Sequence, residues 1–296
     1  MKQLLKKIAI RALGPGHIFP STATPKADVQ NLINTLHPRT VEKGLIRLGP
    51  EGDGGYLIPN DLAGISACFS PGVSAVSGFE KDCAERGIPV FLADKSVTQP
   101  ADTHPLFHFT PKYIGVTTNA DFMKLEDWVK DSLPPTHPVT ERSRSALSHS
   151  QIRSAIHSPS AANCVSPSDL LLQMDIEGYE YETFLATPDD LMRRFRIIVV
   201  ELHWLDQLWS WPFFQLASRA LEKLLQTHVC VHIHPNNCGI LLTKDGLPIP
   251  ATIEATFLRN DRLDSDRYAN TFPHPLDVNN TSAPPITLPP NWYRAA

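Results

Sequence analysis

Residues 170–184 read LLLQMDIEGYEYETF, and this stretch decides how the rest of the chain is interpreted. Its first five residues are mostly apolar, as in a buried strand, and residues 179–186 have the pattern of a helix. Asp175, Glu177 and Gly178 lie between the two. Acids at this point either begin the helix, where they suit its dipole, or carry out chemistry at the end of a strand.

Strand and helix patterns alternate along most of the chain. Further strands are predicted at 65–69, 88–94, 113–116, 196–202, 229–234 and 252–258. Helices are predicted after a turn within 70–87, at 124–133 and at 213–225. This alternation predicts an α/β fold with an open, mostly parallel sheet. Ligands of such sheets bind beyond the carboxyl ends of the strands, near the point where the strand order reverses.

Composition narrows the class of protein. The 296 residues include 27 Lys and Arg and 31 Asp and Glu, a net charge of −4 that provides no general field for binding nucleic acid. Five well-separated cysteines without a C-x-x-C pair predict a reducing compartment, and hence a cytoplasmic location. No apolar run approaches the ~20 residues needed to span a bilayer. The basic segment 1–14 is expected to form a docking or solvent-exposed helix, with weak contact to a membrane surface as the alternative.

Two of the predicted strand ends have features of a ligand site. In the stretch SPGVSAVSGFE (70–80), Gly72 permits a ligand to approach the backbone, and the helix that follows offers free N–H groups. The alternative is a plain strand-to-helix turn. Asp94 ends the next strand, at the position where an acid in dinucleotide-binding folds accepts hydrogen bonds from ribose hydroxyls. A helix cap or an exposed acid is the alternative there.

A second group of polar residues follows two neighbouring buried runs. Asp175 ends one run, and VVELH (199–203) places Glu201 and His203 on the same face at the end of the next. Carboxylates and an imidazole at one sheet edge suit a hard divalent cation or general-base catalysis, whereas a helix cap would explain Asp175 alone. His232 and His234 form an H-x-H pair whose rings point the same way and are able to bind a metal, or to lie satisfied beside a polar cleft.

Six stretches, in this order, carry a resemblance to a known family. They are RLGPEGDGGYLIP (47–59), SPGVSAVSGFE (70–80), LLLQMDIEGYEYETF (170–184), VVELH (199–203), HIHPNN (232–237) and IEATFLRND (253–261). In these six stretches, the chain resembles the FkbM-type family of S-adenosylmethionine-dependent methyltransferases. The most specific element is D-I-E-G-x-E, at residues 175–180. The stretch FPHPLDVNN (272–280) also resembles the C-terminal sequence of a subgroup of these proteins. The resemblance implies a Rossmann-like methyltransferase fold, whose mostly parallel seven-stranded sheet has helices on both faces and an antiparallel last strand.

The resemblance also implies an activity and a set of site residues. The expected reaction is O-methylation of a small-molecule acceptor, at a hydroxyl of a sugar or secondary metabolite, with S-adenosylmethionine as the methyl donor. The cofactor contacts it implies are Asp53, Gly54, Tyr56, Ser70, Gly72, Glu80, Asp94 and Asp175. Candidate catalytic residues are Asp175, His203 and His234. By analogy with similar sugar methyltransferases, Asp175, Glu201 and His203 are the candidate ligands of Mg²⁺.

The resemblance also suggests how the chain is divided. Residues 44–262 are expected to form the methyltransferase domain, with a polar insertion at 134–168. Residues 1–43 are expected to form a helical extension, and 263–296 a Pro-rich tail that Trp292 and Tyr293 hold against the domain. The glycine-rich motif usual in methyltransferases is here S-P-G-V. This departure keeps two alternatives open: a non-catalytic cofactor- or nucleotide-binding module, and a metal-dependent hydrolase.

Overall fold

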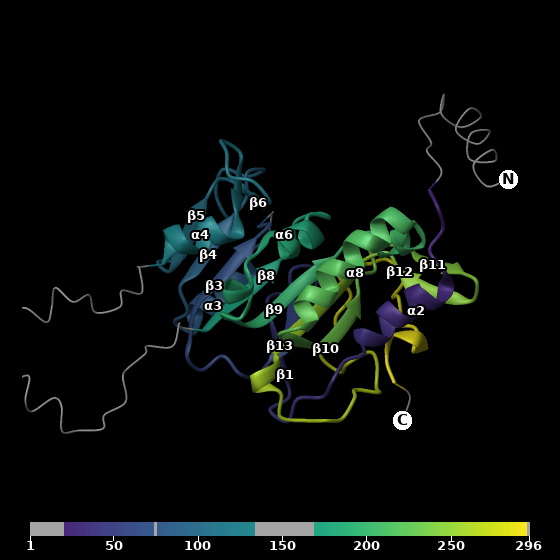
Figure 1. Cartoon of the computed structure of the whole chain (residues 1–296). Helices are drawn as coiled ribbons and strands as arrows, with labels where there is room; N and C mark the ends of the chain where they lie inside the picture. The colour runs from purple at the N-terminus through teal and green to yellow at the C-terminus, as the bar shows by residue number, and fades with distance from the viewer. Residues whose placement is uncertain (1–20, 74–75, 134–168, 295–296) are drawn as a thin grey trace, which may run out of the picture.

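The computed structural model describes residues 21–73, 76–133 and 169–294 (Figure 1). The basic helix predicted in 1–14 and the polar insertion predicted at 134–168 lie outside the described residues. None of the helices in the described ranges is long and apolar enough to cross a membrane.

A seven-stranded sheet forms the centre of the fold. Its order is β10 (His228–Pro235), β13 (Ile253–Arg259), β9 (Phe195–Leu202), β8 (Asp169–Met174), β3 (Ile65–Pro71), β4 (Val90–Ala93) and β5 (Phe107–Thr110). The strands from β9 to β5 are parallel, and β13 runs antiparallel between β10 and β9. The prediction of a mostly parallel α/β sheet with an antiparallel last strand is therefore confirmed. The strand order reverses at β3, since the chain moves from β3 to β4 on one side and to β8 on the other.

The third parallel strand differs from the one predicted. Residues Tyr113–Gly115 do form a strand, β6, but it pairs with β7 (Phe122–Lys124) in a separate two-stranded sheet. The strand that follows β4 in the main sheet is β5, with the sequence FHFT. As the edge strand, β5 is only partly buried, so it lacks the continuous apolar run that marks the central strands.

Helices cover both faces of the sheet because neighbouring strand residues point to opposite faces. In β8, Leu170, Leu172 and Met174 pack into one core, whereas Leu171 belongs to the other. The helices of the first core are α2 (Lys26–Thr35), α4 (Leu125–Ser132), α6 (Glu180–Ala186), α7 (Asp189–Met192) and α8 (Trp211–Leu225). Figure 1 shows α6 and α8 in front of the sheet. The second core is covered by α3 (Gly78–Glu85) and the hairpin of β1 (Leu45–Leu48) and β2 (Tyr56–Pro59).

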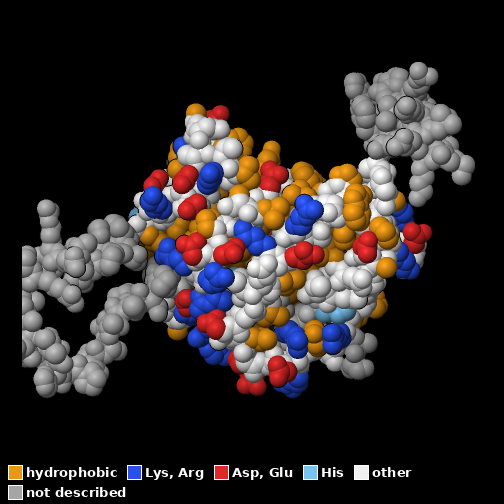
Figure 2. All heavy atoms as spheres, in the orientation of Figure 1, with side chains coloured by type: hydrophobic (Ala, Val, Ile, Leu, Met, Phe, Trp, Pro, Cys, Tyr) orange, Lys and Arg blue, Asp and Glu red, His pale blue; other side chains and the backbone are white. Residues whose placement is uncertain are grey.

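Helix α8 has the burial pattern that its sequence predicts. Phe214, Ala217, Leu221 and Leu224 recur at helical spacing, and all four are buried. Pro212 lies in the first turn, where a missing N–H removes no helical hydrogen bond. On the face drawn in Figure 2, basic and acidic side chains are interspersed, and no patch of one charge extends across it.

The residues after β13 run back over the body of the protein. The indole of Trp292, in the short helix η5 (Pro290–Trp292), is fully buried and its Nε1 donates a hydrogen bond to the carbonyl of Pro248, 3.2 Å away. Pro248 belongs to the hairpin of β11 (Leu241–Lys244) and β12 (Leu247–Pro250). The ring of Tyr293 packs against Phe272 of the same tail, with 5.0 Å between ring centroids, and both rings pack against the first core. Both aromatic residues therefore hold the tail in place.

Trp292→Ala is expected to lower the free energy of unfolding by about 3–5 kcal/mol, because it removes a fully buried aromatic side chain. Leu276→Ala is the matched control, since Leu276 lies in the same tail but is 42% exposed. Its cost is expected to stay within about 0.5 kcal/mol. The measurement is the midpoint of urea unfolding for both variants. Equal midpoints would contradict a tail that is packed into the core.

Candidate functional site

Four strand ends meet at one edge of the sheet and form a cavity. The strands β3, β4, β8 and β9 are followed by Gly72, Asp94, Asp175 and His203. A cavity of about 400 Å³ opens beside them. It is lined by Gly72, Ala93, Asp94, Ser96, Tyr113, Ile114, Phe122, Asp175, Ile176, Glu177 and Tyr179. The rule that ligands bind beyond the carboxyl ends of parallel strands thus predicts the location of this cavity.

Gly72 allows the ends of β3 and β8 to approach closely. Its φ of +95° is a conformation that favours glycine, and a Cβ at this position would lie 1.5 Å from the carbonyl oxygen of Asp175. The backbone here is held by hydrogen bonds from Gly72 N–H to Ala93 and from Asp175 N–H to Pro71. No other residue type fits position 72 without moving the wall that carries Asp175.

Another part of the cavity lining consists of one acidic residue, Asp94, and three aromatic residues. Asp94 is buried, and its Oδ1 accepts a hydrogen bond from the N–H of Ser96 at 2.7 Å. The rings of Tyr113, Phe122 and Tyr179 follow one another, with centroid separations of 5.4 and 6.4 Å. These three aromatic residues were not predicted from the sequence, because the first two belong to the small β6–β7 sheet.

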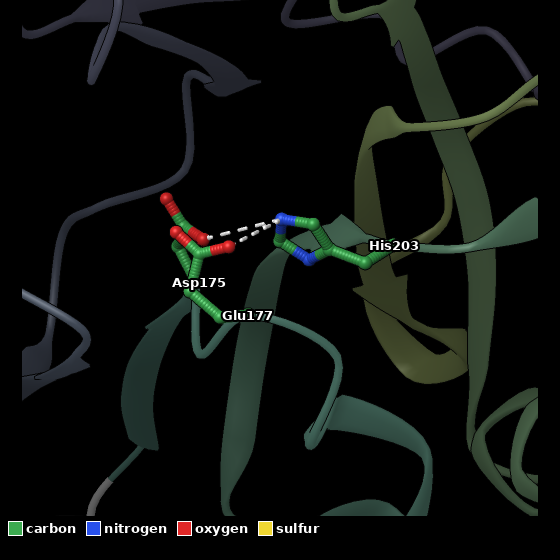
Figure 3. Close-up of side chains that lie close together, drawn as sticks. All are labelled: Asp175, Glu177 and His203. Carbon is green, nitrogen blue, oxygen red and sulfur yellow. Dashed lines mark ion pairs between the residues drawn. The ribbon is translucent and has the colours of Figure 1, made fainter. Parts of the chain in front are cut away.

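His203 lies at the centre of a group of carboxylates. Its Nε2 is 3.6 Å from Glu201 Oε1, 3.7 Å from Glu177 Oε2 and 3.9 Å from Asp175 Oδ1. Figure 3 shows the side chains of Asp175 and Glu177 pointing toward the ring from one side. On its other side, Nδ1 contacts Oε1 of Glu180 at 3.1 Å. The predicted convergence of Asp175, Glu201 and His203 is present in the structure.

Glu180, rather than Asp175, organises the start of α6. Its Oε1 accepts hydrogen bonds from the N–H groups of Ile176 and Gly178, at 3.1 and 3.0 Å. Asp175 makes no capping hydrogen bond to the helix, and its Oδ1 has no hydrogen-bond partner among the described residues. Helix capping therefore does not account for Asp175.

Burial and mutual repulsion shift the pKa values of this group. Burial, with the charge on Glu201, raises the pKa of Asp175 to about 8. Burial, with the charge on Glu254, raises the pKa of Glu201 to about 8. Burial alone would lower the pKa of His203, but the hydrogen bond to Glu180 and the neighbouring carboxylates raise it to about 9. At neutral pH the imidazole is therefore positively charged, and protons are shared among the acids.

Three of these residues fit a divalent cation. Asp175, Glu177 and His203 each offer a ligand atom, and the three atoms lie within 4.8 Å of one another. The unpartnered Oδ1 of Asp175 and the excess of carboxylates over positive groups suit a cation such as Mg²⁺. Glu201, predicted as a ligand, lies nearby but accepts a hydrogen bond from Asn236 at 2.9 Å. Glu177 was not among the predicted ligands, although its D-x-E spacing from Asp175 was visible in the sequence.

A second, smaller cavity of about 30 Å³ adjoins the first. Its lining contains six of the eight predicted cofactor residues, Asp53, Gly54, Tyr56, Gly72, Glu80 and Asp175, together with Val76 and Gln173, which were not predicted. Ser70 lies beside it, and its hydroxyl contacts both Glu80 Oε1 and Gln173 Oε1. One hydroxyl proton cannot serve two acceptors, so a protonated Glu80 that donates to Ser70 satisfies all three groups. Burial raises the pKa of Glu80 to about 7, in agreement with this assignment.

His234 is not brought into the group around His203. It pairs with Glu254 across the β10–β13 ladder, and Glu254 in turn pairs with Glu201 across β13–β9. One strand, β13, therefore separates His234 on β10 from Glu201 on β9. The rings of His232 and His234 face Asp277 of the tail, at 2.8 and 3.5 Å. The catalytic role predicted for His234 stays a prediction.

The tail contributes side chains that the sequence did not indicate as part of the site. Asn280 Nδ2 donates hydrogen bonds to Asp53 at 3.2 Å and to the buried Glu254. Asn237 binds the tail backbone at Thr281. FPHPLDVNN was the only sequence signal for these contacts, and it carried no information about where the tail would pack.

The comparisons with known proteins add no further assignment. A scan against models of protein families finds no match, and a search of the curated proteins finds none. Any proposal of function therefore depends on the geometry of this site and on the sequence motifs that form it.

Glu180→Gln is expected to lower the pKa of His203 from about 9 toward its ordinary value of 6.5, because the variant removes the charge that most favours the imidazolium. The measurement is an NMR titration of the histidine ring resonances. His228 is the internal control, since burial lowers its pKa to about 4 and it lies far from the substitution in the sheet. An unchanged His203 titration would contradict the role assigned to Glu180.

Proposed function

We propose that the protein is an S-adenosylmethionine-dependent O-methyltransferase that acts on a hydroxyl group of a sugar or secondary metabolite. The observation that carries the proposal is the cavity at the strand-order reversal, bordered by Gly72 and Asp94 and adjoining the carboxylates around His203. The antiparallel β13 between β10 and β9 supports it, because the resemblance to the FkbM-type family implies such a last strand.

The cofactor would occupy the larger cavity and extend into the smaller one. Gly72 leaves room for close approach, and the buried Asp94 carboxylate is suited to accept hydrogen bonds from the ribose hydroxyls. Ile114 and the aromatic residues supply apolar surface for the adenine ring. Asp53, Ser70 and Glu80 surround the smaller, polar cavity. When bound, S-adenosylmethionine would supply an electrophilic methyl group next to the acidic residues that line the cavity.

The acids beside the cavity supply a proton acceptor for the acceptor hydroxyl. A hydroxyl is a weak nucleophile at neutral pH and needs alignment with the methyl group and removal of its proton. Asp175 lines the cavity, and its Oδ1 has no hydrogen-bond partner among the described residues. With a pKa of about 8, its ionised form, which would accept the hydroxyl proton, is the minor form at neutral pH and increases as the pH rises toward 8. His203 already carries a proton at neutral pH, so it would stabilise the carboxylates and orient the hydroxyl.

A divalent cation would be held by Asp175, Glu177 and His203. Bound there, it would polarise a hydroxyl of the acceptor and compensate the repulsion among the carboxylates. Coordination by His203 requires a neutral imidazole, so cation binding would release a proton.

Calorimetric titration with S-adenosylhomocysteine, with and without Mg²⁺, tests the proposal directly. Affinity in the micromolar range is expected for the wild-type protein. Asp94→Asn is expected to weaken binding by about ten-fold, because a charged acceptor for ribose hydroxyls is lost. Asp131→Asn, which removes one charge from an exposed position on α4, is the control and should bind like wild type. Binding of Mn²⁺ or Zn²⁺ without any affinity for S-adenosylhomocysteine would favour a hydrolase instead.

Gly72→Ala is expected to weaken binding of S-adenosylhomocysteine by at least about ten-fold, because its Cβ would collide with the Asp175 carbonyl and displace the cavity wall. Gly44→Ala is a matched control: Gly44 also has a positive φ, +70°, but a Cβ there meets no atom within 4 Å. Both variants carry backbone strain, and only the first alters the cavity. Equal affinities for the two variants would remove Gly72 from the cofactor site.

A further inference from the structure

Trp204, directly after His203, has an unusual backbone conformation. Its φ of 59° and ψ of 28° lie in the left-handed region, which is unfavourable for residues that carry a Cβ. Its side chain is 50% exposed, so burial of the indole does not explain the conformation. Residues held in such sparsely populated backbone conformations cluster at functional sites.

The indole is nevertheless fixed in place by Gly178. A Cβ at position 178 would lie 2.4–2.6 Å from three atoms of the six-membered ring of Trp204, so the ring packs directly against the glycine backbone. The N–H of Gly178 donates to Glu180, which also contacts His203. The loop after β8 and the end of β9 therefore form one unit that holds the indole.

This unit connects the indole to the cavity lining, although Trp204 is not itself one of the residues that line the cavity. Gly178 lies between Glu177 and Tyr179, which both line the larger cavity, and Trp204 follows the histidine that contacts Asp175, Glu177 and Glu201. Among the residues that the structure describes, the lining of that cavity contains three acidic side chains, Asp94, Asp175 and Glu177, and no Lys or Arg. Carboxylates accept hydrogen bonds from hydroxyl groups and repel anions.

We propose that Trp204 is the platform on which the acceptor binds, and that this acceptor carries a neutral or amino sugar ring. The proposal rests on the proposed function. The C–H face of a pyranose ring packs on the indole, and its several hydroxyls are donors for the carboxylates of Asp175, Glu177 and Glu201. A planar phenol would also stack, but with a single hydroxyl it would leave most of these acceptors unused. A sugar acid or sugar phosphate would bring a further negative charge beside the acidic residues Asp94, Asp175 and Glu177 that line the cavity.

The test measures sugar binding by ligand-observed NMR, in EDTA and with saturating S-adenosylhomocysteine. The probes are methyl glucopyranoside, glucosamine, glucuronic acid, glucose 6-phosphate and catechol. For wild type, the first two are expected to bind and the two anionic sugars are not. Trp204→Ala is expected to weaken sugar binding by at least about ten-fold, with partial retention in Trp204→Phe. Trp211→Ala is the control, since Trp211 is 38% exposed but lies at the start of α8.

Calorimetry with S-adenosylhomocysteine on the same variants separates this inference from the proposed function. Its affinity is expected to remain within about two-fold of wild type in Trp204→Ala. The proposal that Trp204 is the acceptor platform is overturned by any one of three results. These are unchanged sugar binding in Trp204→Ala, no sugar binding in the wild-type protein, and binding of catechol alone. Sugar binding that depends on Trp204 in a protein without affinity for S-adenosylhomocysteine would keep the platform and reject the methyltransferase.

Discussion

The candidate site depends on one buried carboxylate oxygen, Oε1 of Glu180. It accepts hydrogen bonds from the backbone at Ile176 and Gly178 and contacts Nδ1 of His203. These contacts join the loop after β8 to the end of β9, which are separated by more than one helix in the chain. The side chain of Glu180 is fully buried, so its charge acts on His203 with little screening by water. The orientation of the imidazole and the position of the loop acids both follow from this single acceptor.

The structure contains two clusters of histidines and acids, and the number of acids per histidine differs between them. This difference decides whether the pKa values of the acids are raised or lowered. Around His203 several acids share one imidazole, and the pKa values of Asp175 and Glu201 are raised. On the edge strand β10, two histidines face one acid. The hydrogen bond from His232 and the nearby His234 ring hold the pKa of Asp277 well below its usual range despite burial. The first arrangement suits proton transfer or a cation, whereas the second suits a stable contact between the tail and β10.

The central strands and the meeting of Asp175, Glu201 and His203 could be predicted from the sequence, because both follow from local patterns. Buried parallel strands are apolar runs, and their carboxyl ends share one edge. The edge strand β5 was missed because partial burial weakens its apolar pattern. The position of Glu177 depends on a backbone with φ of 57°, and the contacts of Asp277 and Asn280 depend on how a distant tail packs. A single unusual backbone angle and the packing of a distant tail produce no periodic pattern in the sequence. The positions of these side chains therefore could not be predicted from it.

The antiparallel insertion of β13 has a consequence for the order in which the protein folds. Among the described strands, β10 pairs only with β13, and β13 is synthesised after it. Until residues 253–259 have been synthesised, β10 has no strand to pair with and the open edge of β9 stays exposed. Glu201, near the end of β9, acquires its neighbour Glu254 only in this last step. Completion of the sheet is therefore a late, long-range event, with the slow kinetics that such pairings impose. Until it occurs, the growing chain exposes one edge of β9, which is paired only with β8.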